Sequence, residues 1–167
     1  LKPSKLQKFD FTSYKPSISK VSGICHCSNL PEHIAQRQSD SAAQYLNSRN
    51  FDSNIVTEIL NNPSTGTGIT LWRGLFGGSA LGKKGLPAEK VGKKAAINLI
   101  MELESEATVD IHLSDQLIPY MGLFPGCSYT VRELTQHTKT NIWVTEKFLD
   151  MKFNIIKEND LYQVSSC

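Results

Sequence analysis

The feature that most constrains the fold is a regular apolar pattern between Pro87 and about Glu104. Apolar side chains recur there every three or four residues, at Ala88, Val91, Ala95, Leu99 and Leu103, and Ala96 and Ile100 widen the stripe. Three lysines fall largely on the opposite side of the same stretch: Lys90, Lys93 and Lys94. This spacing predicts an amphipathic α-helix with one side facing a core and one solvated side.

Short apolar or alternating segments elsewhere in the chain are typical of β-strands. We expect strands over about Ser17–Cys27, Ile55–Leu60, Ile69–Leu75, Ser128–Leu134, Lys152–Lys157 and Leu161–Val164, a short one inside Gly74–Gly85, and one around Lys5–Phe11. The turn-rich segment Asn61–Gly68 makes the strands on either side of it candidate hairpin partners. Glu158-Asn159-Asp160 is expected to close a second hairpin.

Three further helices are expected, over about Asn29–Asn47, Leu113–Leu123 and Thr140–Leu149. Asn29 is the candidate N-cap of the first, because Pro31 would lie in the first turn and Glu32 three residues after the cap. Pro119 is expected to bend or shorten the second helix. Strands mixed with amphipathic helices predict an α/β or α+β fold.

Composition narrows the class of protein only broadly. The 167 residues carry 18 Lys and Arg against 16 Asp and Glu, a net charge of +2, and 40% of them are hydrophobic. This favours a folded chain of one domain or two small ones, and it permits a nucleic-acid partner without indicating one. Apolar runs are too short to span a bilayer and the Leu-Lys-Pro start has no signal-peptide pattern, so a cytoplasmic protein with no membrane partner is expected.

The four cysteines are too few for a disulfide scaffold in a chain of this length: Cys25, Cys27, Cys127 and Cys167. Cys25-His26-Cys27 would place two thiols on the same side of a strand, but no second pair of ligands completes a zinc site. We therefore expect reduced thiols on a half-buried strand, and we assign no metal ligand.

Gly77–Lys84 matches the G-x-x-x-x-G-K pattern of a phosphate-binding loop only in part. Such a loop needs Ser or Thr after its Lys to hold Mg²⁺, and a helix that begins at once. Lys84 occupies the Ser/Thr position and Pro87 delays the helix, so we interpret the stretch as a glycine turn with two exposed lysines.

Two polar segments carry candidate functional side chains. His137 lies within Thr135–Asn141, after a predicted strand and before a predicted helix, where side chains and free backbone N–H groups converge. Its imidazole could be a nucleophile toward phosphorus, a general base or a metal ligand, or it could simply help to cap the helix. His112, Asp115 and Gln116 stand at another predicted helix start, which suits a ligand site or a polar cap equally.

Several separated segments, taken together, resemble the RNA 3′-terminal phosphate cyclase family, and its archaeal members look nearest. The matching segments, in the family's order, are Leu30–Arg37, Gly82–Gly92, His112–Pro119, Thr135–Asn141 and Glu146–Leu149. The resemblance runs over nearly the whole chain, and several motifs matching in order are far more specific than any one of them.

The resemblance implies the last repeated α/β unit of a large catalytic domain that carries a small inserted α/β domain. Residues 1–13 would be a strand of the large domain, 14–107 the insert with about four strands and two helices, and 108–167 the C-terminal unit of the large domain. The N-terminal half of the family's chain would then be missing, and Leu1 would be an internal residue.

The resemblance also implies a ligase-type activity that uses ATP to convert an RNA 3′-terminal phosphate to a 2′,3′-cyclic phosphate, releasing AMP and pyrophosphate. His137 matches the nucleophile that forms a covalent histidinyl-AMP intermediate. Asp115 and Gln116 match the nucleotide-site pair, and His112 stands where some members stack an aromatic residue on adenine. The implied cofactors are ATP and Mg²⁺ or Mn²⁺, the implied partners are the RNA and the missing half, and a homodimer is left open.

One branch of the family is non-catalytic, binds RNA in ribosome assembly and lacks the nucleophilic histidine. The presence of His137 favours the enzyme over this alternative. The isolated chain is expected to be inactive, because the other half of the nucleotide and RNA site would be absent.

Overall fold

The computed structural model describes residues 7–17 and 19–167 and divides the chain into two compact units. The first, Pro16–Glu104, is called here the continuous unit. The second consists of Leu1–Lys15 and Ser105–Cys167 and is called the split unit. The segment that forms the continuous unit therefore interrupts the sequence of the split unit.

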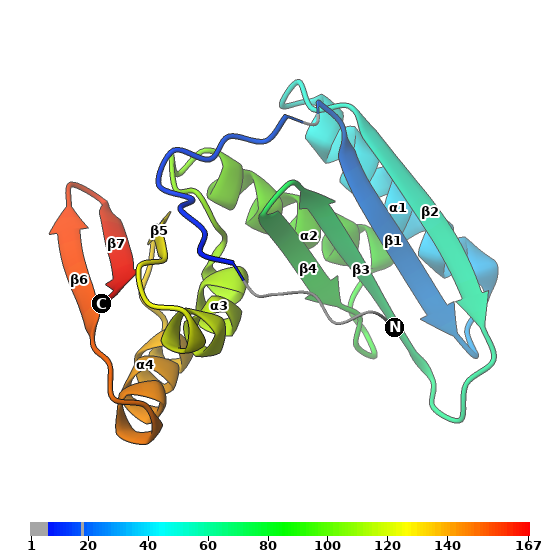
Figure 1. The fold of residues 1–167 in the computed structure, drawn as a ribbon. Helices are drawn as coiled ribbons and strands as arrows, with labels where there is room; N and C mark the ends of the chain where they lie inside the picture. Colours follow the sequence, from blue (N-terminus) through cyan, green and yellow to red (C-terminus); the bar gives the residue numbers. More distant parts are fainter. Residues whose placement is uncertain (1–6, 18) are drawn as a thin grey trace. The chain divides into compact units, whose positions relative to one another are not determined.

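The continuous unit is a four-stranded sheet with two helices on one face (Figure 1). Its elements are β1 (Val21–Ser28), α1 (Glu32–Asn47), β2 (Ser53–Leu60), β3 (Gly66–Arg73), β4 (Phe76–Leu81) and α2 (Ala88–Leu103). The apolar stripe of α2 is buried as predicted, with Ala95 and Leu99 fully enclosed, while its lysines are exposed. The core lies between this face of the sheet and the two helices, where Cys25 and Leu46 are also fully buried.

The expected hairpin between Ile55–Leu60 and Ile69–Leu75 is wrong. The strand order is β2-β1-β3-β4, with β1 parallel to β2 and antiparallel to β3, so β1 lies between the two proposed partners. Alternate residues of β1 are fully buried from Val21 onward, whereas β2 is largely exposed. The strand in the central position is thus the more buried of the two, and α1 provides the crossover to its parallel neighbour.

The start of the first helix also differs from the prediction. Helix α1 begins at Glu32, Pro31 occupies the N-cap position and makes no side-chain capping bond. Asn29 instead adopts a left-handed backbone conformation, with φ of 54°, in the turn that precedes the helix. Its side-chain amide donates to the carbonyl oxygen of Asn62 at 2.6 Å, so Asn29 joins two loops rather than capping α1.

The split unit is a three-stranded antiparallel sheet, in the order β5-β7-β6, with two helices. Its elements are α3 (Ile111–Leu123), β5 (Ser128–Val131), α4 (Gln136–Phe148), β6 (Phe153–Glu158) and β7 (Leu161–Ser166). Ile118, Met121, Tyr129 and Val164 are fully buried in it. The hairpin predicted around Asn159 is present, and Pro119 lies inside α3, which runs on to Leu123.

Two boundaries in the split unit are corrected. Helix α4 begins at Gln136 rather than Thr140, because Thr135 is a true N-cap whose hydroxyl accepts from the N–H of Thr138 at 3.1 Å. β5 accordingly ends at Val131 instead of Leu134. The strand expected around Lys5–Phe11 falls partly outside the described residues, and the described part forms a single bridge between Asp10 and Ser128.

The prediction of a mixed α/β fold is confirmed, with two sheets and four helices in the described part of the chain. None of the helices in residues 7–17 and 19–167 is long and apolar enough to cross a membrane.

Candidate functional site

A buried cluster of hydroxyl groups joins the start of α3 to the start of α4. The Ser114 hydroxyl lies 3.2 Å from that of Tyr129 and 3.3 Å from that of Thr138, and all three side chains are fully buried. The Tyr129 hydroxyl also donates to the Ser114 carbonyl oxygen at 2.9 Å. Because buried polar groups are costly unless paired, this cluster fixes the two helices and β5 relative to one another.

A second contact continues the junction one step further along both helices. The side-chain amide of Asn141 donates to the backbone carbonyl oxygen of Asp115 at 3.0 Å. His137 lies one helical turn before Asn141, on the same side of α4. The fold therefore brings the backbone at Asp115 to the part of α4 that carries His137.

The N-cap of α3 is Asp110, whose carboxylate accepts from the backbone N–H groups of His112 at 2.8 Å and Leu113 at 2.7 Å. His112, Asp115 and Gln116 are therefore not needed to cap the helix. His112 and Gln116 are exposed, and Asp115 is partly exposed. The sequence left two interpretations open for this segment, a ligand site or a polar cap. The residue that caps the helix is Asp110.

His137 is an exposed residue in the first turn of α4. Thr135 caps the helix, so His137 does not. No described residue accepts a hydrogen bond from the backbone N–H groups of Gln136 and His137, which leaves both donors open at the positive end of the helix dipole. Such an end attracts phosphate oxygens, and exposed Lys139 adds a positive charge in the same turn.

The four predicted side chains are not joined directly to one another. Within residues 7–17 and 19–167, no hydrogen bond or ion pair links His137 with Asp115, or either of them with His112 or Gln116. The orientation of the imidazole by Asp115 stays a prediction. What the structure adds is the junction between α3 and α4, built from Ser114, Thr138 and Asn141.

The cysteine and glycine motifs are structural in this fold. Cys25 and Cys27 are free, buried thiols on β1, and the described residues contain no group of three or more His, Cys, Asp or Glu side chains that could hold a metal ion. Gly77 and Gly78 lie in β4 rather than in a turn, which corrects that part of the interpretation. A Cβ at Gly78 would lie 2.4 Å from the backbone nitrogen of Leu99, so the glycine allows α2 to approach the strand.

Sequence reasoning passed over a cavity of about 480 Å³ that is lined wholly by residues of the continuous unit. Gln38 projects into it from α1. The signal was present in the sequence, because Gln38 stands at helical spacing between Ala35 and Ala42, which are both fully buried. A polar residue within a buried stripe indicates either a structural hydrogen bond or a site.

A continuous α/β unit set within the sequence of a second α/β unit defines a protein with an inserted domain. Comparison with known families gives the same division: residues 14–104 match the insert domain of RNA 3′-terminal phosphate cyclase. The chain belongs to the RNA 3′-terminal phosphate cyclase family.

Curated relatives named RNA 3′-terminal phosphate cyclase are similar over most of this chain. The protein of Methanosarcina barkeri is 54% identical over 98% of this chain and 49% of its own length. That of Methanococcoides burtonii is 52% identical over 99% of this chain and 49% of its own, and that of Pyrococcus abyssi is 45% identical over 83% and 42%. The chain thus spans about half the length of the curated relatives that it matches.

Proposed function

We propose that this chain is the part of an RNA 3′-terminal phosphate cyclase that carries the nucleophilic histidine, His137. The observation that carries the proposal is the position of His137: an exposed imidazole in the first turn of a capped helix, beside two open backbone N–H donors, in a member of this family. An exposed imidazole can reach a phosphorus atom, and the open donors suit the oxygens around it.

The reaction proceeds in three displacements at phosphorus. An imidazole nitrogen of His137 attacks the α-phosphorus of ATP, so that a P–N bond forms and pyrophosphate leaves. An oxygen of the RNA 3′-phosphate then attacks the same phosphorus, the P–N bond breaks and the imidazole is released. Finally the 2′-oxygen of the RNA attacks the 3′-phosphorus, the ring closes and AMP leaves. Adenylylation converts a poor leaving group into a good one, which is the purpose of the covalent step.

The remaining predicted residues have supporting roles in this proposal. Asp115 orients the His137 imidazole or approaches a divalent cation, Gln116 hydrogen-bonds the nucleotide, and His112 offers a stacking surface for adenine. Mg²⁺ or Mn²⁺ would bind the triphosphate oxygens, since Mg²⁺ usually keeps few protein ligands at nucleotide sites. Bound there, the ion would neutralise the charge that develops on the phosphates.

The domain assignment is part of the same proposal. We assign residues 14–107 to the insert, and residues 1–13 and 108–167 to the large catalytic domain. Several large apolar side chains of the split unit are exposed: Tyr120 by 57%, Leu123 by 56%, Trp143 by 62% and Phe148 by 84%. Large exposed apolar side chains are often covered by another part of a protein, and the rest of the large domain is the occupant that we propose for these four.

The test uses the protein with both halves present, incubated with ATP that is labelled on the α-phosphate. We expect an acid-labile label on the protein that His137→Ala abolishes. His33→Ala removes an exposed histidine of α1 and serves as the matched control, which should retain the label. Absence of the label, or its persistence in His137→Ala, would refute the nucleophilic role. RNA binding without any adenylylation would support the non-catalytic alternative instead.

A further inference from the structure

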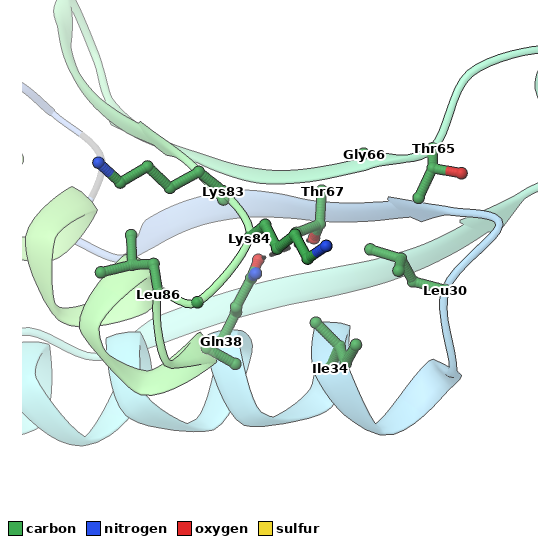
Figure 2. Close-up of a pocket in the computed structure, with 12 residues that line it drawn as sticks. Leu30, Ile34, Gln38, Thr65, Gly66, Thr67, Lys83, Lys84 and Leu86 are labelled. Carbon is green, nitrogen blue, oxygen red and sulfur yellow. Dashed lines mark hydrogen bonds between the residues drawn. The ribbon is translucent and has the colours of Figure 1, made fainter.

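The cavity in the continuous unit has no part in the proposed reaction, since it shares no residue with the histidine centre. It lies between α1, the first residues of β3 and the loop that joins β4 to α2 (Figure 2). Its volume of about 480 Å³ is in the range of sites that hold small organic ligands. One face is apolar, with Leu30, Ile34 and Leu86 among the lining side chains.

Gln38 is the polar group built into this cavity. Its side chain is 1% exposed, and its Oε1 accepts hydrogen bonds from the Cys25 thiol at 3.3 Å and from the Thr67 hydroxyl at 3.1 Å. The structure places Oε1 on this side of the amide, and the Cys25 thiol and the Thr67 hydroxyl also lie within hydrogen-bond distance of the carbonyl oxygens of Ala35, at 3.3 Å, and His26, at 2.9 Å. Among the described residues nothing accepts a hydrogen bond from Nε2 of Gln38. An amide N–H group on a side chain that is 1% exposed and lines the cavity is therefore left for a ligand.

Two neighbouring lysines of the loop behave differently. Figure 2 shows Lys84 extending across the cavity toward Leu30, whereas Lys83 turns away from it. No described carboxylate forms an ion pair with Lys84, and no Asp or Glu lines the cavity. The polar side of the cavity therefore offers an ammonium group and an amide N–H group, which together suit an oxyanion.

We propose that this cavity binds an organic phosphate of the size of a single nucleotide. Lys84 and Nε2 of Gln38 contact the phosphate oxygens, and the wall that contains Leu30, Ile34 and Leu86 covers the flat apolar part. A phosphate ion alone would leave the apolar wall and most of the volume unused. A free mononucleotide and the terminal nucleotide of an RNA strand share this chemistry, and the experiment separates them.

The experiment titrates the 167-residue chain with AMP, with a short RNA that ends in a 3′-phosphate, and with inorganic phosphate, followed by amide NMR spectra. We expect AMP or the RNA to shift the side-chain amide signals of Gln38 and the backbone signals of Gly82 and Gly85. Lys84→Gln is expected to weaken this binding about tenfold, in keeping with a hydrogen bond to a charged group. The matched control, Lys83→Gln, removes the same charge one residue away and should change affinity less than twofold.

A second variant protects the test against misfolding. Gln38→Met keeps about the same side-chain volume and removes the amide N–H donor, so this variant should bind AMP or the RNA more weakly. Thermal unfolding of the variant, measured separately, shows whether it is still folded. His137→Ala should retain the shifts at this cavity, which distinguishes the proposal from the histidine centre. Three results would overturn the proposal: no shift with either AMP or RNA, equal weakening by Lys83→Gln and Lys84→Gln, or binding of inorganic phosphate as tight as that of AMP.

Discussion

The hydroxyl of Tyr129 is a single polar group on which three elements of the split unit depend. It is fully buried, and burial raises the pKa of the phenol, so it stays protonated and can donate at any ordinary pH. Its hydrogen bond to the Ser114 carbonyl oxygen and its contact with the Ser114 hydroxyl place α3 against β5. Ser114 in turn contacts Thr138 in the turn of α4 that carries His137.

Tyr129→Phe removes this hydroxyl and keeps the ring. We expect the free energy of unfolding to fall by about 1 kcal/mol, because a buried hydrogen bond is lost and its partners stay buried. Urea unfolding measures the change. Tyr120→Phe is the control, since Tyr120 is 57% exposed and should give no measurable difference. Equal stability of the Tyr129→Phe chain and the unaltered chain would contradict this account of the junction.

The thiols differ in their exposure, and this predicts their reactivity. Cys167 is exposed, whereas Cys25, Cys27 and Cys127 are buried. Burial raises the pKa of Cys25 to about 11, so it remains a protonated thiol even at pH 9. With a disulfide reagent at pH 8 we expect one fast-reacting thiol per chain, lost in Cys167→Ser, and full reactivity only in denaturant. A fast phase that survives in Cys167→Ser would show that a second thiol is accessible.

At the scale of elements, the contact between α1 and α2 is set by a glycine. A Cβ at Gly92 would lie 2.0 Å from the carbonyl oxygen and 2.9 Å from the carbonyl carbon of Gln38. The backbones of the two helices therefore meet where α1 carries the cavity glutamine. Beside this contact, Arg37 donates to the Glu89 carboxylate through two nitrogens, at 2.7 and 3.0 Å.

Gly92→Ala improves helix propensity by about 1 kcal/mol and should still destabilise the chain. The added methyl group would force the two packed helix backbones apart. Overpacking of this kind costs about 1–3 kcal/mol or more, which outweighs the gain in helix propensity, so we expect a net loss of stability. Thermal unfolding of the 167-residue chain measures it. The matched control is Gly66→Ala, at a position where a Cβ would meet no atom within 4 Å. Greater stability of Gly92→Ala would mean that the helices separate at little cost.

Glu146 connects α4 to β6 and gives this link a pH dependence. Its carboxylate accepts from the backbone N–H of Phe153 at 2.9 Å and from Lys152 at 3.1 Å. The hydrogen bond from Phe153 is the main cause that lowers the pKa of Glu146. A lowered pKa in the folded state means that the stabilisation is complete above the ordinary pKa of a glutamate and is lost as the pH falls.

Glu146→Gln should therefore reduce the free energy of unfolding at pH 7, and the difference from the unaltered chain should shrink as the pH falls below about 4.3, the ordinary glutamate value. Urea unfolding across this pH range follows the effect. A difference that stays constant between pH 7 and pH 3 would show that ionisation of Glu146 has no part in the link.

For the molecule as a whole, the two units differ in how completely they enclose a core. In the continuous unit one face of the sheet is covered by α1 and α2 (Figure 1), and sixteen of the described hydrophobic residues of this unit are buried. The split unit has a smaller core and exposes large side chains such as Trp143 and Phe148. We expect the first unit to be independently stable and the second to need a partner.

Residues 16–104 alone should therefore unfold cooperatively and give dispersed NMR signals. Residues 105–167 alone should bind the dye ANS, because their apolar surface is uncovered. Circular dichroism, NMR and dye fluorescence test the two polypeptides side by side. Collapsed, poorly dispersed spectra for residues 16–104 would show that its core needs the rest of the chain.

Because the chain spans about half the length of the relatives that it matches, we propose that cyclisation needs residues outside it. The 167-residue chain should not cyclise RNA by itself. Cyclisation by this chain at the rate of the protein with both halves would refute that expectation.

Local pattern was sufficient to predict the kind and order of most elements of this protein. The helix Ala88–Leu103 and the hairpin around Asn159 follow from periodicity and turn residues, because burial on one side leaves a regular trace along the chain. Boundaries were less well predicted. Thr135 caps α4 and Asn29 does not cap α1, since several polar residues near each start could cap and only the backbone geometry chooses among them.

Only the tertiary structure decided which distant segments meet. The central position of β1, the contact of Ser114 with Thr138 and the open amide of Gln38 all depend on competition between segments far apart in the sequence. A periodic pattern records how much of a residue is buried but not against what, because the hydrophobic effect has no direction. The sequence alone therefore determined the order and kind of most elements, and the packing of those elements determined the junction at His137 and the cavity at Lys84.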